Sequence, residues 1–308
     1  MSAPLVSIVI PAYNYAATLE RAAASAMAQP GEDFDLWIVD DGSSDDTPQV
    51  GAALEQRWPG RCHYRRQDNA GPAAARNHGL RLSEGRYLLF FDADDELLPD
   101  ALETFRSAVR QHPAAGVILA EHESVEENGK TKQHRQKPLP ATARQRLRAY
   151  LLDKSLTVSH GSVLLRRDVF AAYRYPERFR AAEDLPVFAH ALVNFDCALA
   201  QRPTARVHKH AGSLRGNAEA AAAGSLELVE EIFDPKRMPA WAMELKPAYT
   251  ARRHLSLFRT LLRARRPSEA LPHYLAALRL TPFAALRPGY IAKALRALGY
   301  CLARCRRT

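Results

Sequence analysis

The sequence predicts an α/β fold built on a mainly parallel β-sheet. Short segments of β-type residues alternate with helical segments over about the first 120 residues, which is the pattern of consecutive βαβ units. Three of the predicted strands also end in polar or acidic turns, where open α/β sheets bind their ligands. With 308 residues, 47% of them apolar and 25% charged, the chain is large enough for one sizeable domain or two.

The first part of the chain alternates regularly between the two kinds of element. A first strand is closed by Pro11, and the helix that follows stops at Pro30 and Gly31. Gly71 and Pro72 open another helix, since proline is favoured at the first helical position. We expect strands over 6–10, 35–40, 62–65, 87–91 and 116–120, and helices over 16–29, 48–58, 72–83 and 99–111.

The second part is less regular. Residues 126–140 are polar and rich in Lys and Gln, which predicts an exposed excursion. An alanine-rich stretch over 218–223 marks a predicted domain boundary. From about Trp241 the pattern is helical, with breaks predicted near Pro267, Pro272, Pro282 and Pro288. Between these regions we expect helices over 141–152, from 166 and over 183–194, and strands over 162–165, 195–200 and 205–208.

Positive charge is concentrated at the C-terminal end. The formal net charge is +9, but from residue 240 onward 14 Lys and Arg face only Glu244 and Glu269, so the preceding residues are slightly acidic overall. Cations interleaved with apolar residues at helical spacing can lie on an anionic membrane surface. A solvated helical hairpin with snorkelling Arg side chains is the alternative, and no recognised module supports binding to nucleic acid.

Other compositional signals concern redox state and location. The four cysteines, Cys62, Cys197, Cys301 and Cys305, form no paired C-x-x-C motifs, which disfavours a disulfide framework and a structural zinc site. The N-terminus has no signal-peptide layout, and no apolar run approaches the ~18 residues needed to span a bilayer. We therefore expect a cytoplasmic protein.

Three carboxylates follow a segment that reads as a buried strand. Asp92, Asp94 and Asp95 come directly after the aromatic and branched residues of 87–91. Buried strands do not lead into charged groups unless something compensates them, and divalent cations prefer carboxylate oxygens. Polar turns also follow the first two strands, so a parallel sheet brings all three turns to one edge. This predicts a metal ion that bridges to a diphosphate; a polar loop with helix-capping Asp is the alternative.

Four segments carry a resemblance to a known family. They are VSIVIPAYN at 6–14, VDDGSSDDT at 39–47, NAGPAAARNHG at 69–79 and FDADD at 91–95. In this order and spacing, residues 5 to about 215 resemble a family 2 glycosyltransferase, which implies the GT-A fold. The predicted domains are a GT-A domain over 1–217 and a basic helical extension over 218–308. Within the first, the resemblance implies a nucleotide-sugar half at about 1–120 and an acceptor half at about 121–217.

The resemblance also implies roles for individual residues. Asp41 would accept a hydrogen bond from the base, and Asp184 would be the general base, with Glu183 orienting it or the acceptor. Asp94 would ligate Mn²⁺ or Mg²⁺ together with His210, which fits an H-x-x-S element ending at Ser213 better than His208 does. The residues expected to bind the nucleotide sugar are Pro11, Ala12, Tyr13, Asn14, Asp41, Arg76, Asp92, Ala93 and Asp94.

Each of these residues also has a structural interpretation. Asp41 could cap a turn, and Arg76 could pair with the acidic edge. Glu183 and Asp184 could stabilise a helix N-terminus, where carboxylates are favoured. The two histidines could be ordinary core or surface residues.

The resemblance implies an inverting, metal-dependent transfer of one hexose from a UDP-sugar to an acceptor hydroxyl. The expected acceptor is a lipopolysaccharide core or a surface-polysaccharide intermediate, reached by a peripheral enzyme on the inner face of the cell membrane. The Q-x-x-R-W element and transmembrane helices of processive synthases are missing, which favours single-sugar addition.

Other functions are weaker interpretations of the sequence. A pyrophosphorylase would need a Gly-rich basic loop after the first strand, and a dinucleotide oxidoreductase would need G-x-G-x-x-G there. Pro11, Ala12, Tyr13 and Asn14 occupy that place instead. A non-catalytic scaffold that binds nucleotide sugars or carbohydrate stays open as the alternative.

Overall fold

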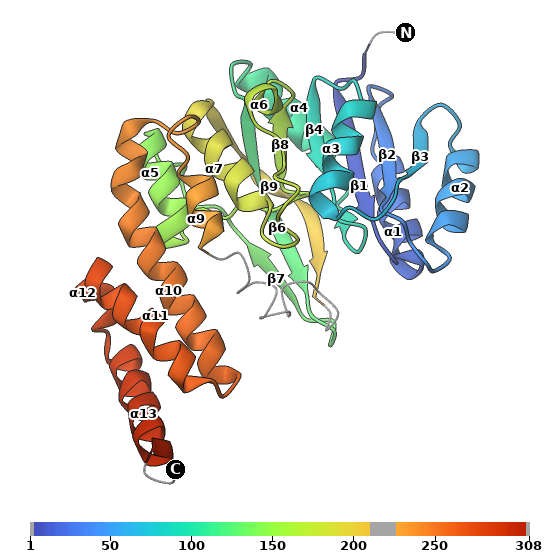
Figure 1. Ribbon diagram of the computed structural model, residues 1–308. Coiled ribbons are helices and arrows are strands. Elements are labelled where there is room, and N and C mark those ends of the chain that lie inside the picture. Colours follow the sequence, from blue (N-terminus) through green and yellow to red (C-terminus); the bar gives the residue numbers. More distant parts are fainter. Residues whose placement is uncertain (1–2, 210–225, 306–308) are drawn as a thin grey trace.

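The computed structural model describes residues 3–209 and 226–305, and it contains a nine-stranded mixed sheet. Along the sheet the order is β3-β2-β1-β4-β8-β6-β9-β5, and β7 pairs with β6. The first four strands are β1 (Val6–Ala12), β2 (Phe34–Asp40), β3 (Cys62–Arg66) and β4 (Tyr87–Phe90), and they run parallel. The predicted α/β fold is therefore confirmed, and the polar turns leave this part of the sheet at one edge (Figure 1).

Helices cover both faces of the parallel part. They are α1 (Ala16–Met27), α2 (Thr47–Arg57), α3 (Pro72–Leu82) and α4 (Ala101–Gln111). Alternate residues of β1 enter different cores, with Ile8 and Ile10 in one and Val9 in the other. All three are fully buried, because a parallel sheet covered on both faces has no solvent-facing side.

The second half of the sheet is mixed. It comprises β5 (Glu96–Leu97), β6 (Val117–Val125), β7 (Thr131–His134), β8 (Val163–Arg166) and β9 (Cys197–His208). Strand β8 runs antiparallel between β4 and β6, and β9 runs parallel to β6. The helices here are α5 (Ala143–Arg148), which continues as a π-helix η1 (Ala149–Asp153), then α6 (Val169–Ala172) and α7 (Asp184–Asn194).

The strands of this second half are longer than the sequence predicts. The segments 195–200 and 205–208 form one strand, β9, and β6 extends beyond residue 120 to Val125. The predicted excursion at 126–140 contains β7, and the short β5 was not predicted. Polar residues and Pro203 hide the continuity of β9 from a local pattern. Its pairing with β6 continues through two register shifts next to Glu121, so tertiary pairing overrides local propensity.

Two prolines that are expected from the sequence to end an element lie inside one instead. Pro11 belongs to β1, whose pairing with β4 stops at Val9, so the missing N–H of Pro11 faces the side where no ladder bond is needed. Pro272 lies inside α11 (Pro267–Leu280). Because Pro272 has no N–H, the carbonyl oxygen of Ser268 has no helical hydrogen-bond donor. Both residues are exposed, so water can hydrate that carbonyl.

The C-terminal region is helical, as predicted. It contains α9 (Glu227–Ile232), a 3₁₀ helix η3 (Ala240–Leu245), α10 (Lys246–Arg263), α11, α12 (Pro282–Ala285) and α13 (Pro288–Cys305). Buried residues from Leu228 to Tyr249 share a core with α5 and α7, whereas α10 to α13 pack around a core of their own. Figure 1 shows α11, α12 and α13 extending away from the sheet. The predicted boundary at 217/218 lies outside the described residues, so the domain division stays a prediction.

Candidate active site

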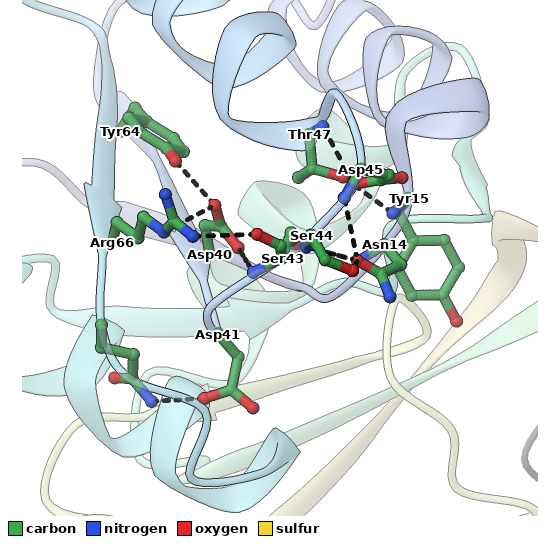
Figure 2. A network of polar contacts seen from close by, with 11 residues as sticks. Asn14, Tyr15, Asp40, Asp41, Ser43, Ser44, Asp45, Thr47, Tyr64 and Arg66 are labelled. Atoms are coloured by element: carbon green, nitrogen blue, oxygen red, sulfur yellow. Dashed lines mark hydrogen bonds and ion pairs between the residues drawn. The ribbon is translucent and has the colours of Figure 1, made fainter.

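The turns after β1 and β2 are joined by direct hydrogen bonds (Figure 2). The backbone N–H of Asn14 donates to Ser43 Oγ at 2.9 Å, and Asn14 Oδ1 accepts from the N–H of Ser44 at 2.8 Å. Asn14 has a φ of 59°, a left-handed conformation that asparagine adopts more readily than most residues. The N–H of Tyr15 donates to Thr47 Oγ1. The turn after β1 and the turn after β2 therefore form one hydrogen-bonded unit.

The two adjacent acids of the second turn, Asp40 and Asp41, have different hydrogen-bond partners. Asp40 is fully buried and accepts hydrogen bonds from Ser43 N–H and Tyr64 Oη (Figure 2). Asp41, 3% exposed, accepts from Gln67 Nε2 and from the N–H groups of Ala70 and Gly71. Asp41 thus holds the loop that begins α3. A carboxylate has about four acceptor positions, so these three hydrogen bonds leave at most about one.

The third turn lies against the same unit. Arg21 of α1 donates to the carbonyl oxygen of Asp94 at 2.6 Å, and the N–H of His208 donates to Asp95 Oδ1 at 3.0 Å. Burial, followed by the carboxylates of Asp94, Asp92 and Asp95, raises the pKa of the Tyr15 phenol well above its usual range. Tyr15 follows the first turn, so the structure brings the acids of the third turn to it.

A buried arginine connects this edge to the second half of the chain. Arg76 of α3 donates to Asp92 Oδ1 at 3.0 Å and to Glu183 Oε1 at 2.5 Å. Burial alone would lower the pKa of the Arg76 guanidinium, but the carboxylates of Glu183 and Asp92 more than offset it and raise that pKa. Arg76 thereby links the first acid of the D-x-D segment to the acid preceding Asp184.

Sequence reasoning missed two members of this network. His160 is buried, with Nε2 3.1 Å from Tyr175 Oη and Nδ1 3.8 Å from Asp92 Oδ1. Tyr175 is also buried, and its ring centroid lies 5.6 Å from Arg76 Cζ. Neither residue stands in a recognisable motif. A lone His and a lone Tyr carry no local signal, and only the packing of the 160–175 segment brings them to Asp92.

Asp184 begins α7 and is half-buried. Burial raises the pKa of the Tyr150 phenol on η1, and the Asp184 carboxylate raises it further. Burial also raises the pKa of Tyr249 on α10, where the cations of Arg253 and Arg252 oppose the shift and the Asp184 carboxylate adds to it. Ala182, just before the acidic pair, has a φ of 60°, a strained conformation for alanine that is common at functional sites. Tyr249 shares a hydrophobic core against which Ala182 and Leu185, close to Asp184 in the sequence, also pack.

The predicted metal ligands are only partly placed. Asp92 and Asp94 are both half-buried at the sheet edge, while His210 lies outside the described residues. His208 Nε2 is 3.4 Å from Glu96 Oε1. Within residues 3–209 and 226–305 no group of three His, Cys, Asp or Glu side chains is arranged to hold a metal ion. The edge fits a cation whose remaining ligands would come from water, a bound diphosphate or His210.

Comparison with known proteins decides the family. The family model described as Glycosyl transferase family 2 matches residues 7–174, more than half of the chain. The chain belongs to glycosyltransferase family 2. Relatives of this family 2 member include succinoglycan biosynthesis protein ExoO of Rhizobium meliloti, 38% identical over 117 residues, and chondroitin synthase of Escherichia coli, 34% identical over 128 residues. The alignments cover 38% and 41% of this chain but only 32% and 18% of those proteins.

Solved structures agree on the fold of this family 2 chain. TarS 1–349 of S. aureus in complex with UDP-GlcNAc superposes with a TM-score of 0.60 at 17% identity, covering 95% of this chain and 88% of that one. The mannosyltransferase PcManGT of Pyrobaculum calidifontis, in complex with GDP-Man and Mn²⁺, superposes with a TM-score of 0.56 at 20% identity, covering 96% and 85%. The expected GT-A fold is thereby confirmed. None of the helices in the described segments could cross a membrane.

Proposed function

We propose that this family 2 chain transfers a single hexose from a UDP-sugar to an acceptor hydroxyl with inversion at the anomeric carbon. The observation that carries the proposal is the acidic edge: Asp92 and Asp94 follow a buried strand, and Arg76 connects Asp92 to the segment that contains Asp184. The presence of UDP-GlcNAc in TarS, and of GDP-Man with Mn²⁺ in PcManGT, supports a nucleotide-sugar donor.

The joined turns provide the donor side in this proposal. Pro11, Ala12, Tyr13 and Asn14 would contact the nucleoside, and Asp41 would accept a hydrogen bond from the base. Tyr13 is 47% exposed, which leaves its ring available to a ligand. Asp92, Ala93 and Arg76 would lie beside the ribose and the donor sugar.

The carboxylate of Asp94, with His210 as the second candidate, would hold Mn²⁺ or Mg²⁺. When bound, the cation would neutralise charge on the departing diphosphate. The chain's contribution is to fix the position of Asp94, because Arg21 holds its carbonyl and His208 holds the adjacent Asp95.

Asp184 would act as the general base. Its carboxylate would take the proton of the acceptor hydroxyl while that oxygen bonds to the anomeric carbon and the bond to the diphosphate breaks on the opposite face. Glu183, whose carboxylate Arg76 holds, would help to position the acceptor or to orient Asp184. The absence of a Q-x-x-R-W element supports release after one addition rather than polymerisation.

The acceptor in this proposal is a glycan on a lipopolysaccharide core or a surface-polysaccharide intermediate, and the basic helices α10 to α13 would bring the enzyme to the inner face of the cell membrane. Nine large apolar residues are exposed in the described part of the chain, and seven of them lie between residues 275 and 300. They share these helices with an excess of Arg, the combination expected for a peripheral membrane surface.

The proposal is tested with purified protein, Mn²⁺ and a panel of UDP-sugars, by following UDP release with and without glycan acceptors. Asp184→Asn should lower turnover about 10²- to 10⁴-fold, the usual contribution of a general base. Asp153→Asn is the matched control, since that acid is exposed and pairs with Arg148 away from the edge. UDP binding with no turnover by the unaltered protein would favour the scaffold alternative, and equal rates for Asp184→Asn would remove Asp184 from the mechanism.

A further inference from the structure

A second charged feature lies at the opposite end of strand β4 from the acidic turn. A hollow of about 600 Å³ is formed by the end of α3, the start of β4, the end of β8 and α6. It is at the amino end of β4, whereas the acidic turn follows the carboxyl end of that strand. Five arginines line this hollow, which we call the arginine hollow: Arg81, Arg86, Arg166, Arg167 and Arg174.

Two of these arginines have structural partners. Arg167 donates to the carbonyl oxygens of Gly85 and Leu80 and to Ser83 Oγ, which fixes the chain between α3 and β4. Arg166 donates to both carboxylate oxygens of Asp168, at 2.9 and 2.8 Å. The acid that lines the hollow is therefore already engaged, and these two guanidiniums need no ligand.

The other three arginines are exposed and form no ion pair with a residue that the structure describes. Arg86 lies over the ring of Tyr87, 5.5 Å from its centroid, and Arg81 and Arg174 complete the rim. Like charges around one hollow repel each other unless an anion joins them. The chain before residue 240 is slightly acidic overall, so this concentration of arginine is a local feature and not part of a generally basic surface.

We propose that the arginine hollow binds a phosphate or diphosphate group, as a second site distinct from the donor site. Guanidinium groups bind phosphate oxygens in pairs, which makes arginine the preferred residue for such anions. Leu80 and Phe170 lie beneath the hollow and are only 5% and 2% exposed, so the arginines and the exposed Ala171 make up most of its accessible lining. The same chemistry can come from a soluble phosphate compound or from the phosphorylated head of a glycolipid.

The test is isothermal titration of the full-length protein, in EDTA so that the metal-dependent donor site does not contribute. The probes are sodium pyrophosphate and monomeric dihexanoyl phosphatidic acid. The variant combines Arg81→Gln, Arg86→Gln and Arg174→Gln. The matched control, with the same change of charge at three exposed cationic residues outside helices α10 to α13, combines Arg135→Gln, Lys137→Gln and Arg202→Gln.

We expect the unaltered protein and the control to bind pyrophosphate equally, and the variant to bind at least tenfold more weakly. Tighter binding of the phosphatidic acid than of pyrophosphate would identify a lipid-linked source, and the reverse order a soluble one. Circular dichroism should show that the variant is folded, since Arg166 and Arg167 are retained. Equal binding by variant and control, or no binding of either probe at millimolar concentration, would overturn the proposal. Because no nucleotide sugar is present, neither result depends on the transferase activity.

Discussion

At the scale of single residues, the guanidinium of Arg76 is held between two carboxylates near the site. It is 5% exposed and its two carboxylate partners come from segments that are 16 and 107 residues away in sequence. The sequence left two interpretations open, a contact with the donor and a structural pair. The ion pairs support the second without removing the first, because Asp92 is half-buried and accessible from the edge.

Arg76→Met should destabilise the protein strongly, because it leaves Glu183 charged, buried and without its cation. Removing one partner of a buried ion pair costs about 3–5 kcal/mol. Arg57→Met, which removes an exposed pair with Glu20, should cost about 1 kcal/mol or less. Urea denaturation at pH 7 measures both, and adding Glu183→Leu should recover part of the loss. A cost for Arg76→Met no larger than for Arg57→Met would show that Glu183 is solvated.

At the scale of elements, the packing of α3 on β1 depends on a missing side chain. A Cβ built on Gly79 would lie 2.3 Å from Val9 Cγ1, and Val9 is fully buried between helices and sheet. This close packing sets the distance between α3 and β1. It therefore also sets the position of Arg76, one turn earlier on α3, relative to Asp92. The glycine is visible in the sequence, but its reason is visible only in the packed structure.

Gly79→Ala should therefore destabilise the protein by about 1–3 kcal/mol through overpacking, against its favourable helix propensity. Gly299→Ala in α13 is the matched control, because no atom lies within 4 Å of the added Cβ. That change should be neutral or stabilise by up to about 1 kcal/mol. Thermal unfolding compares the two. A destabilisation of equal size at both positions would contradict the packing argument.

The contact between α10 and α11 includes a pair of histidines that should respond to acid. His254 Nδ1 and His273 Nδ1 are 2.9 Å apart. Burial lowers the pKa of both imidazoles, and His273 lowers that of His254 further. These histidines therefore bind protons more readily in the unfolded chain than in the folded one. The stability that they contribute above the ordinary histidine pKa of ~6.5 is lost as pH falls through their lowered folded-state pKa values.

The urea midpoint should accordingly be lower at pH 5.5 than at pH 7.5. The double variant His254→Gln/His273→Gln should show a smaller difference between the two pH values, although other histidines with lowered pKa, such as His190, keep some of it. The exposed His112→Gln serves as control and should leave the difference unchanged. A pH dependence that is the same in the double variant and the unaltered protein would rule out the pair as a contributor.

At the scale of the whole molecule, helices α11 to α13 extend away from the sheet (Figure 1), and they carry exposed apolar side chains. Phe283 in α12 is 92% exposed and Leu286, directly after it, is 51% exposed. The core shared by α5, α7 and residues up to Tyr249 means that deleting everything from residue 240 would also damage the fold. Point substitutions are the cleaner test of membrane binding.

Phe283→Ser/Leu286→Ser should weaken flotation with vesicles of phosphatidylglycerol and phosphatidylcholine several-fold, while Leu226→Ser, an exposed leucine elsewhere, should not. Binding of the unaltered protein should also decrease with salt and be weaker on phosphatidylcholine alone, because anionic lipid attracts the Arg side chains. Equal flotation of the double variant and the unaltered protein would exclude this surface as the membrane contact.

The sequence by itself determined the alternating elements of the first half, the parallel order that gathers three turns at one edge, and the family. These follow from local periodicity and from contiguous motifs, both of which are readable along the chain. Only the tertiary structure decided that β9 is one strand, that Asp41 holds the loop before α3, that Tyr249 of the tail shares a core with Leu185 of α7, and that His160 and Tyr175 join Arg76 at Asp92. Those contacts connect residues far apart in sequence, and their energy comes from burial and pairing that no local pattern encodes.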